Sequence, residues 1–358
     1  MSLLNILLGI LVLTILATVH ELGHFVFARL ARVPVEEFAL GFGPAILSKR
    51  RGGTNYRLNI IPVLAYVKIK GMEPGDVTPD GFNAQRFWKR FLILAGGPLL
   101  NILLALLLFL FLFSFSSMPT TIIGEIMPSS PAEKSGILIG DEILAINGEN
   151  VKTWEDIVRK ISEQGEKPTL TFSIFHFFIP FGVNKQGEKP TLTFSLKRGT
   201  ESLVITTTPT YLEEEKRYIV GIIPTLARRN FSQAVSSAFH YFGQVFLLIF
   251  SSLGMLFSGK AGISDFAGPV GIVQITAQQA QAGVLNLLGI TGILSMALGA
   301  FNLIPFPALD GGHLLFLVVE GISGKKVSPK VQYALNTLGF LILLGFLLIV
   351  TWGDILRL

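Results

Sequence analysis

Two histidines and a glutamate stand in a part of the chain where charged side chains are rare. His20, Glu21 and His24 lie in an apolar run over residues 3–28, and Glu21 is its first charge. A run of this length can cross a bilayer as a helix, and ionisable groups in such a helix indicate a functional site. His20 and His24 share a helix face, so both imidazoles can bind one metal ion. Glu21 lies beside them, where it can polarise a water that the metal holds.

Zinc is the metal that best suits these ligands. The chain has no cysteine, so a metal site must use His, Asp or Glu, and disulfides are excluded. Three fixed residues in a pattern of five also occur by chance in roughly one chain in a hundred of this length. The alternative interpretation is a polar patch for helix packing, which leaves a glutamate in lipid without a partner.

Composition indicates a polytopic α-helical membrane protein. Half of the 358 residues are hydrophobic (50%) and only 15% are charged. The formal net charge of +5 is modest, so no nucleic-acid partner is expected, and the lipid bilayer is the expected environment. Met1 and Ser2 carry no positive charge, which favours a retained span over a signal peptide for the first apolar run.

The loop after the first run is strongly basic. By the positive-inside rule it lies in the cytoplasm, with the N-terminus outside and His20 and His24 in the cytoplasmic third of the membrane. Residues 56–70 are β-branched, partly alternating and preceded by turn residues, which predicts a small hairpin or sheet. This sheet can dip toward the membrane where protein or water covers its backbone, and its edge can pair with an extended peptide. A cytoplasmic sheet that only packs fits these residues equally well.

A second span is predicted over residues 91–115, returning outward. An aromatic and basic anchor precedes it at residues 87–90. The small residues at 95–98 and the polar Asn101 suit close contact between helices.

Residues 119–209 have the composition of a soluble domain. The order is a strand at 122–126, a capped short helix at 130–136, a strand and turn at 141–148, and an amphipathic helix at 153–161. A final hairpin is expected within residues 195–206. This order resembles a PDZ domain of the bacterial protease-associated type, which binds extended peptide ends by strand addition.

One ten-residue segment of this domain occurs twice. Residues 164–173 recur without change at 186–195, a separation of 22 residues. The extra residues around 173–195 indicate a tandem duplication or insertion, which we predict to be dispensable. The apolar stretch at 173–181 has an alternative interpretation as a loop that dips into the membrane surface.

A third metal ligand is available in the C-terminal half. In residues 302–313 two prolines break a helix and two glycines loosen it, and Asp310 enters near the membrane boundary. A carboxylate is a suitable third protein ligand for a catalytic zinc with an open position. Asp310 can meet His20 and His24 only if residues 284–304 run inward. We therefore predict about four transmembrane helices, with residues 234–257 packed as an interfacial or re-entrant helix on the outer side.

Taken together, the motifs resemble a known family. The zinc-type motif at 20–24, the PDZ-like segment, the Gly-Pro-Val-Gly at 268–271 and residues 302–312 resemble the site-2 protease family of intramembrane zinc metalloproteases, in its bacterial RseP-like branch. The resemblance covers nearly the whole chain, although some relatives have two PDZ domains. It implies a Zn²⁺ cofactor held by His20, His24 and Asp310, with Glu21 as the general base. It implies substrate handling at Asn302, Pro305, Gly41 and Gly43.

The resemblance also implies a function and a location. The substrates would be single-span membrane proteins of the anti-sigma factor type or leftover signal peptides, and the PDZ domain would bind peptide ends. The protein would lie in the bacterial inner membrane as a multi-pass chain, with its active site toward the cytoplasm and its PDZ domain extracytoplasmic. The predicted parts are an N-terminal membrane half at 1–118, the PDZ domain at 119–209, extracytoplasmic interfacial helices at 210–283 and a C-terminal membrane half at 284–358.

Two alternative functions fit some of these residues. An intramembrane His, Glu and Asp set also suits an ion or proton transporter. A PDZ-based membrane scaffold without protease activity is the other alternative. The four-residue spacing of His20 and His24, with Asp310 on a broken helix, favours a metal site.

Overall fold

The structure is a computed structural model that describes residues 3–162, 191–212, 217–259, 262 and 266–357. The chain forms two compact units, one of residues 1–112 and 236–358 and the other of residues 113–235. We call them the helical unit and the sheet unit. Each is described by itself.

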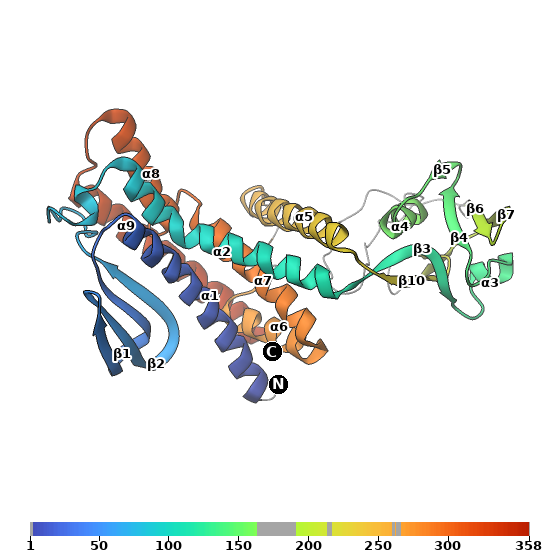
Figure 1. Ribbon diagram of the computed structural model, residues 1–358, viewed down its shortest axis with the longest axis horizontal. Helices are drawn as coiled ribbons and strands as arrows, with labels where there is room; N and C mark the ends of the chain where they lie inside the picture. The colour runs from blue at the N-terminus through green and yellow to red at the C-terminus, as the bar shows by residue number, and fades with distance from the viewer. Residues whose placement is uncertain (1–2, 163–190, 213–216, 260–261, 263–265, 358) are drawn as a thin grey trace. The chain divides into compact units, whose positions relative to one another are not determined.

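Long apolar helices dominate the helical unit (Figure 1). Five described helices are long and apolar enough to cross a membrane, where a helix satisfies its own backbone hydrogen bonds. They are α1 (Leu3–Leu30), α2 (Phe87–Phe115), α5 (Phe231–Phe257), α7 (Val284–Asn302) and α9 (Pro329–Leu356). Two shorter helices, α6 (Pro269–Ala282) and α8 (Asp310–Ser323), and a 3₁₀ turn at Phe82–Ala84 complete the set. The chain is a polytopic membrane protein, as predicted.

Contacts along α2 fix the directions of its neighbours. Near one end of α2, Gly96 packs against Gly23 of α1, and one turn further along, Asn101 lies beside His20, so α1 and α2 are antiparallel. On α7, Gly299 packs against Pro98 and Ser295 donates a hydrogen bond to the carbonyl of Asn101.

Further along α2, Phe109 packs against Gly292 of α7. The residue numbers of α7 therefore fall as those of α2 rise, and α7 runs in the same direction as α1. The sequence-based topology requires this direction if Asp310 is to meet the two histidines. The prediction that residues 234–257 do not cross the membrane stays a prediction, because α5 is long enough to do so.

A folded hairpin lies beside α1 (Figure 1). Its strands β1 (Val35–Arg51) and β2 (Thr54–Ile69) both bend, so each pairs with its partner twice: Phe38 pairs with Val67 and also with Tyr56. The result is four short strands in the order 45–51, 54–59, 35–40 and 65–69. The sheet predicted at 56–70 is confirmed, and it extends over residues 35–51 as well.

Glycines make the bend in β1 possible. Gly41 and Gly43 have φ values of +83° and +90°, a region that side chains other than glycine rarely adopt. The bends leave a row of large apolar side chains exposed at this end of the hairpin: Phe42, Ile46, Leu47, Ile60, Ile61 and Leu64. We call this end the apolar tip.

The sheet unit has a six-stranded antiparallel sheet. Its order is β10-β3-β4-β6-β7, and β5 pairs with β4. The strands are β3 (Ser117–Ile126), β4 (Glu142–Ile146), β5 (Glu149–Asn150), β6 (Leu192–Arg198), β7 (Glu201–Thr207) and β10 (Ile222–Arg228). Helices α3 (Pro131–Ser135) and α4 (Trp154–Ser162) belong to this unit, with the small pair β8 (Thr210–Leu212) and β9 (Arg217–Ile219). Its core buries Ile123, Ile143, Ile157 and Phe194 completely or nearly so.

Most of the elements predicted in this unit are confirmed. The short helix α3 begins at an N-cap, because the Ser130 hydroxyl accepts a hydrogen bond from the Glu133 amide, and it ends at Gly136 with a φ of +81°. The final hairpin is formed by β6 and β7. The predicted duplication around 173–195 falls mostly outside the described residues, but its last residues, from Leu192 onward, form the start of β6.

One predicted boundary is wrong. Residues 210–283 were expected to be interfacial helices, but residues 210–212, 217–219 and 222–228 are strands, and β10 pairs with β3. The cause is β-pairing that local sequence does not reveal: the edge of β3 offers free backbone groups, and the β-branched, apolar residues of 219–226 satisfy them. The sheet unit therefore continues to residue 235.

An ion pair joins the residue before β4, Asp141, to the last residue of β6, Arg198. The Asp141 side chain is fully buried, and it accepts hydrogen bonds from Arg198 at 2.7 and 2.8 Å and from the Leu138 amide at 2.9 Å. The Arg198 guanidinium holds the pKa of the Asp141 carboxyl below its usual value, despite the opposing effect of burial.

Candidate functional site

Three side chains from two helices converge in the helical unit. The Nε2 atoms of His20 and His24 are 3.2 Å apart. Oδ2 of Asp310 lies 3.0 Å from Nε2 of His20 and 3.3 Å from Nε2 of His24. The two histidines are one turn apart on α1, and Asp310 is the first residue of α8. The structure thus brings together all three of the ligands predicted from the sequence.

The convergence fits a metal cation. Both histidines are buried, and Asp310 is nearly so. Within the part of the chain that the structure describes, no hydrogen bond of good geometry reaches Oδ2 of Asp310. An unsatisfied buried carboxylate oxygen is costly, and the two imidazole nitrogens are close enough to share a cation with it. Two imidazoles and one carboxylate are a donor set that zinc uses in catalytic sites.

Backbone and amide groups orient the two imidazoles. Nδ1 of His24 lies 2.8 Å from the carbonyl oxygen of Ile93, which requires a proton on Nδ1 and leaves Nε2 free to bind a metal. Nδ1 of His20 lies 3.4 Å from the Asn101 side-chain amide. Asn101 is fully buried, and its Oδ1 has no hydrogen-bond partner among the described residues. Turning the amide by 180° would let Oδ1 accept the Nδ1 proton of His20.

Sequence reasoning did not find this role of Asn101. It interpreted the residue only as a polar helix-packing position. The available signal was weak: a single amide in an otherwise apolar span, which is expensive to bury without a partner.

Glycines let the histidine helix approach α2. A Cβ atom at Gly23 would overlap the backbone of Gly96, and a Cβ atom at Gly97 would overlap the His24 imidazole. The small residues predicted to favour close helix contact therefore leave space for the metal-binding side of His24. Because Gly23 and Gly97 have no side chains, α1 and the His24 imidazole can lie close to α2.

The loop between α7 and α8 positions Asp310. A Cβ atom at Gly311 would overlap the Ile304 carbonyl, and one at Gly312 would overlap the Phe306 carbonyl. The Ala308 amide donates a hydrogen bond of 3.3 Å to Oδ1 of Asn336 on α9. The two glycines after Asp310 thus allow the loop to fold back on the start of α8.

Glu21 faces the sheet. One of its carboxylate oxygens accepts a hydrogen bond of 3.1 Å from the backbone N–H of Val67, in the outer strand at 65–69. Glu21 contributes no atom to the cluster of His20, His24 and Asp310. His20, which precedes Glu21 in the chain, belongs to the cluster. The Glu21 carboxylate is therefore held between the cluster and the edge of the sheet.

The four predicted substrate-handling residues contribute no ligand atom to the cluster. The side-chain amide of Asn302 donates to the carbonyl of Leu298 in its own helix at 2.9 Å, and Pro305 lies in the loop before α8. Gly41 and Gly43 form the bend of β1, where the carbonyl of Gly41 accepts a hydrogen bond of 2.7 Å from the buried Asn59.

A bundle of membrane-length helices with a buried cluster of two histidines and one aspartate, beside a sheet edge, defines a membrane metalloprotein. The model of peptidase family M50 matches residues 8–346. The chain belongs to peptidase family M50. It is accordingly a metalloprotease whose metal is zinc, as the sequence predicted.

Individual relatives match along almost their whole length. The chain is 34% identical to a candidate zinc metalloprotease of Clostridium acetobutylicum, over 99% of this chain and 98% of that one. It is 33% identical to a candidate zinc metalloprotease of Clostridium perfringens, over 98% of each chain. It is 27% identical to the regulator of sigma-W protease RasP of Bacillus subtilis, over 95% of each chain.

Proposed function

We propose that this zinc protease cleaves single-span membrane proteins within the bilayer, with His20, His24 and Asp310 as the zinc ligands and Glu21 as the general base. The observation that carries the proposal is the meeting of three ligand atoms from α1 and α8 among membrane-length helices. Such a cluster inside a membrane protein needs a cation to compensate the buried carboxylate.

The protein residues each have a defined task in this mechanism. When bound, zinc lowers the pKa of a water to roughly 7 and polarises the carbonyl of the peptide bond. Glu21 accepts a proton from the attacking water at a carboxylate oxygen and delivers it to the leaving nitrogen. The hydrogen bond from Val67 keeps this carboxylate at the edge of the sheet while it does so.

The sheet edge suits an unwound substrate. A helical substrate hides its amides in hydrogen bonds, so the segment to be cleaved must unwind first, and backbone groups freed in lipid need new partners. The outer strand at 65–69 offers such partners by strand addition next to Glu21. The bend at Gly41 and Gly43 and the loop with Asn302 and Pro305 are, by the family resemblance, the other parts that hold the substrate.

Two residues set the orientation of the ligands. The carbonyl of Ile93 fixes the proton of His24 on Nδ1. With its amide turned by 180°, the side chain of Asn101 would place its oxygen at Nδ1 of His20 and do the same there. Both residues lie on α2, so the contact between α1 and α2 is part of the metal site.

The sheet unit acts as a PDZ domain in this proposal, and it binds peptide ends by strand addition. Its capped helix α3, antiparallel sheet and amphipathic α4 support that assignment. It is extracytoplasmic, and the cluster faces the cytoplasm in the bacterial inner membrane, because the basic loop follows α1. The substrates are of the anti-sigma factor type or are leftover signal peptides. The name of the RasP relative, a regulator of sigma-W, supports the first of these.

The role of Glu21 can be tested by one substitution. Glu21→Gln keeps the shape of the side chain but removes the base, so zinc is retained and cleavage is lost. Zinc content by elemental analysis should stay at about one equivalent, and turnover of a single-span substrate in detergent or liposomes should fall by about 10²–10⁴-fold. Undiminished turnover would refute the general-base role. Loss of zinc together with activity would show that Glu21 is a ligand instead.

A further inference from the structure

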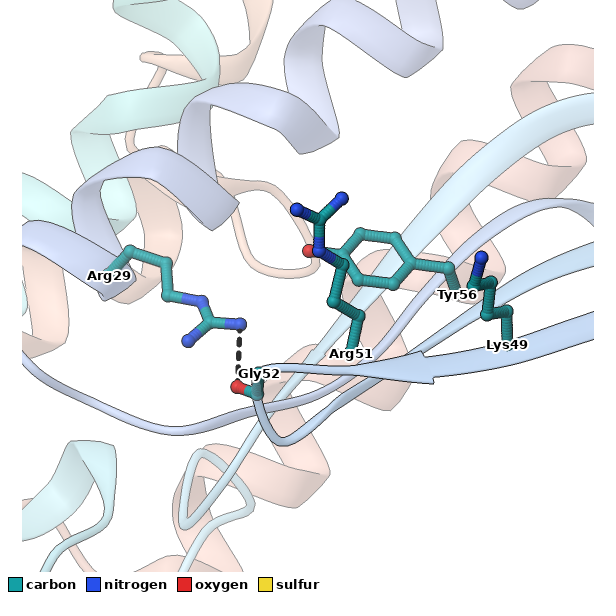
Figure 2. Close-up of a pocket in the computed structure, with 5 residues that line it drawn as sticks. All are labelled: Arg29, Lys49, Arg51, Gly52 and Tyr56. Carbon is teal, nitrogen blue, oxygen red and sulfur yellow. Dashed lines mark hydrogen bonds between the residues drawn. The ribbon is translucent and has the colours of Figure 1, made fainter.

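A basic pocket lies where the end of α1 meets the folded hairpin (Figure 2), and none of the residues that line it belongs to the His and Asp cluster. Its volume is about 560 Å³, and it is open on one side. Arg29 of α1 lines it together with Lys49, Arg51, Gly52 and Tyr56 of the hairpin. We call it the basic pocket. Figure 2 shows Arg29 reaching the turn at Gly52 from the end of its helix.

The cations of the basic pocket lack acidic partners. Within the described ranges, Arg29, Lys49 and Arg51 form no ion pair with a carboxylate. Three other cations of the same loop do have acidic partners: Arg57 pairs with Glu37, Lys68 with Glu36 and Lys70 with Asp80. Three cations without an ion pair to a described carboxylate therefore line one pocket.

The pocket is partly built before any ligand arrives. Nη2 of Arg29 donates to the carbonyl of Gly52 at 3.0 Å and to the hydroxyl of Thr54 at 2.8 Å. The hydroxyl of Thr54, which is fully buried, in turn donates to the carbonyl of Val35 at 2.7 Å. These bonds hold one guanidinium nitrogen and leave the others free to donate to an anion.

The pocket lies at a membrane boundary. Arg29 is in the last turn of α1, whose membrane-length segment is Ile6–Leu30. Leu22, Val26 and Leu30 are spaced four residues apart on α1 and are 40%, 38% and 72% exposed, so they form an apolar stripe that ends beside Arg29. An apolar chain lying along that stripe would bring a polar group at its end to the pocket.

We propose that the basic pocket binds the phosphate of an anionic phospholipid, whose acyl chains lie along the stripe of Leu22, Val26 and Leu30. Guanidinium groups donate paired hydrogen bonds to phosphate oxygens, and Lys49 adds a compact positive charge. Three unmatched cations select a lipid with net negative charge over a zwitterionic one, whose headgroup brings a cation of its own. The lipid would tie the end of α1 to strands 45–51 and 54–59.

Neighbouring arginines give a matched test. Arg50 stands between Lys49 and Arg51 on the same strand, so its side chain points to the other face of the sheet, and it does not line the pocket. Binding of palmitoyl-oleoyl phosphatidylglycerol to the purified full-length protein in neutral detergent is measured by native mass spectrometry. Arg51→Gln should weaken this binding about fivefold, the effect of about one charge at a membrane surface. Arg50→Gln should leave it unchanged, and Arg51→Lys should restore most of it.

Further measurements distinguish a lipid phosphate from other phosphate compounds and from a substrate segment in the basic pocket. Phosphatidylcholine, inorganic phosphate and glycerol 3-phosphate should each bind at least tenfold more weakly than phosphatidylglycerol. Equal loss in the Arg50 and Arg51 variants would overturn the proposal in favour of diffuse surface attraction. Equal binding of inorganic phosphate would overturn the lipid assignment. Unchanged lipid binding by Arg51→Gln with poorer substrate cleavage would assign the pocket to an acidic segment of the substrate. Unchanged zinc content in all variants serves as the folding control.

Discussion

Two aspartates with little exposed side chain, one in each unit, have opposite surroundings. Asp141 of the sheet unit accepts two hydrogen bonds from Arg198 and one from a backbone amide, so its charge is compensated by the protein. Asp310 of the helical unit faces two imidazole nitrogens, and no good hydrogen bond reaches its Oδ2 within the described residues. A charge that the fold compensates stabilises the fold. A charge left for an ion to compensate stabilises the bound ion.

One isosteric substitution at each aspartate tests whether Asp310 serves the metal and Asp141 serves the fold. Asp310→Asn should reduce zinc content to near zero and abolish cleavage, because a neutral amide is a poor third ligand. Asp141→Asn should leave zinc content unchanged and lower the unfolding midpoint of the sheet unit, because Arg198 loses its partner. Elemental analysis and hydrogen-exchange mass spectrometry on the full-length chain separate the two effects. Retained zinc in Asp310→Asn would contradict the ligand assignment.

Gly97 tests whether the metal site depends on empty space as well as on ligands. Gly97→Ala places a methyl group where the His24 imidazole lies, so the imidazole must leave its present position. We expect turnover to fall by about 10²-fold, the cost of a roughly 1 Å misplacement in an active site. Gly345→Ala is the matched control, since a Cβ atom at this position in α9 meets no atom within 4 Å. Equal activity of the two variants would show that the helices adjust freely.

Asn101 gives a smaller effect of the same kind. Asn101→Leu keeps the volume but removes the amide oxygen that orients His20, and zinc affinity should fall about 10–100-fold. Competition with a chelator measures the affinity directly. Ser295→Ala is the control, because the Ser295 hydroxyl donates to the backbone carbonyl of Asn101 and not to its side chain, so the affinity should change little. An unchanged affinity in Asn101→Leu would limit the residue to helix packing.

Low pH should give the smallest of these effects, a loss of stability in the sheet unit through Asp141. The folded-state pKa of Asp141 lies below its unfolded value of about 3.9, so the pair with Arg198 contributes its full stability above pH 4. This stability is lost as the pH falls through the lower, folded-state pKa. Hydrogen exchange in β4 and β6 should report the loss. Arg198→Gln should remove most of this pH dependence, and a variant that keeps it would contradict the assignment.

Local sequence patterns predicted the clustered residues better than they predicted the residues that orient them. His20 and His24 are one helical turn apart, so their meeting needs no tertiary information. Asp310 is far away in the sequence and was assigned by the chemistry of the missing ligand and by family resemblance. The contacts from Val67 to Glu21 and from Asn101 to His20 depend on how a strand and a second helix pack on α1, which spacing along the chain does not encode.

The same limit explains the errors of the fold prediction. The double pairing of β1 with β2 requires two bends, and residues 35–51 do not alternate in polarity as a half-buried strand does. The strand β10 satisfies the edge of β3 about a hundred residues earlier in the chain, so a boundary at residue 209 looked complete from the local pattern. Composition was sufficient for the membrane class, because helices in lipid must be long and apolar.

The double bend of the hairpin has a consequence for the strand beside Glu21. The turns at residues 41–45 and 60–64 lie at the apolar tip, while strand 65–69 pairs with strand 35–40 near its attachment to α1. Residues added to or lost from the tip leave the pairing of these two strands in place, so the side chains beside Glu21 keep their faces. The pairing that places Val67 beside Glu21 therefore does not depend on the length of the tip.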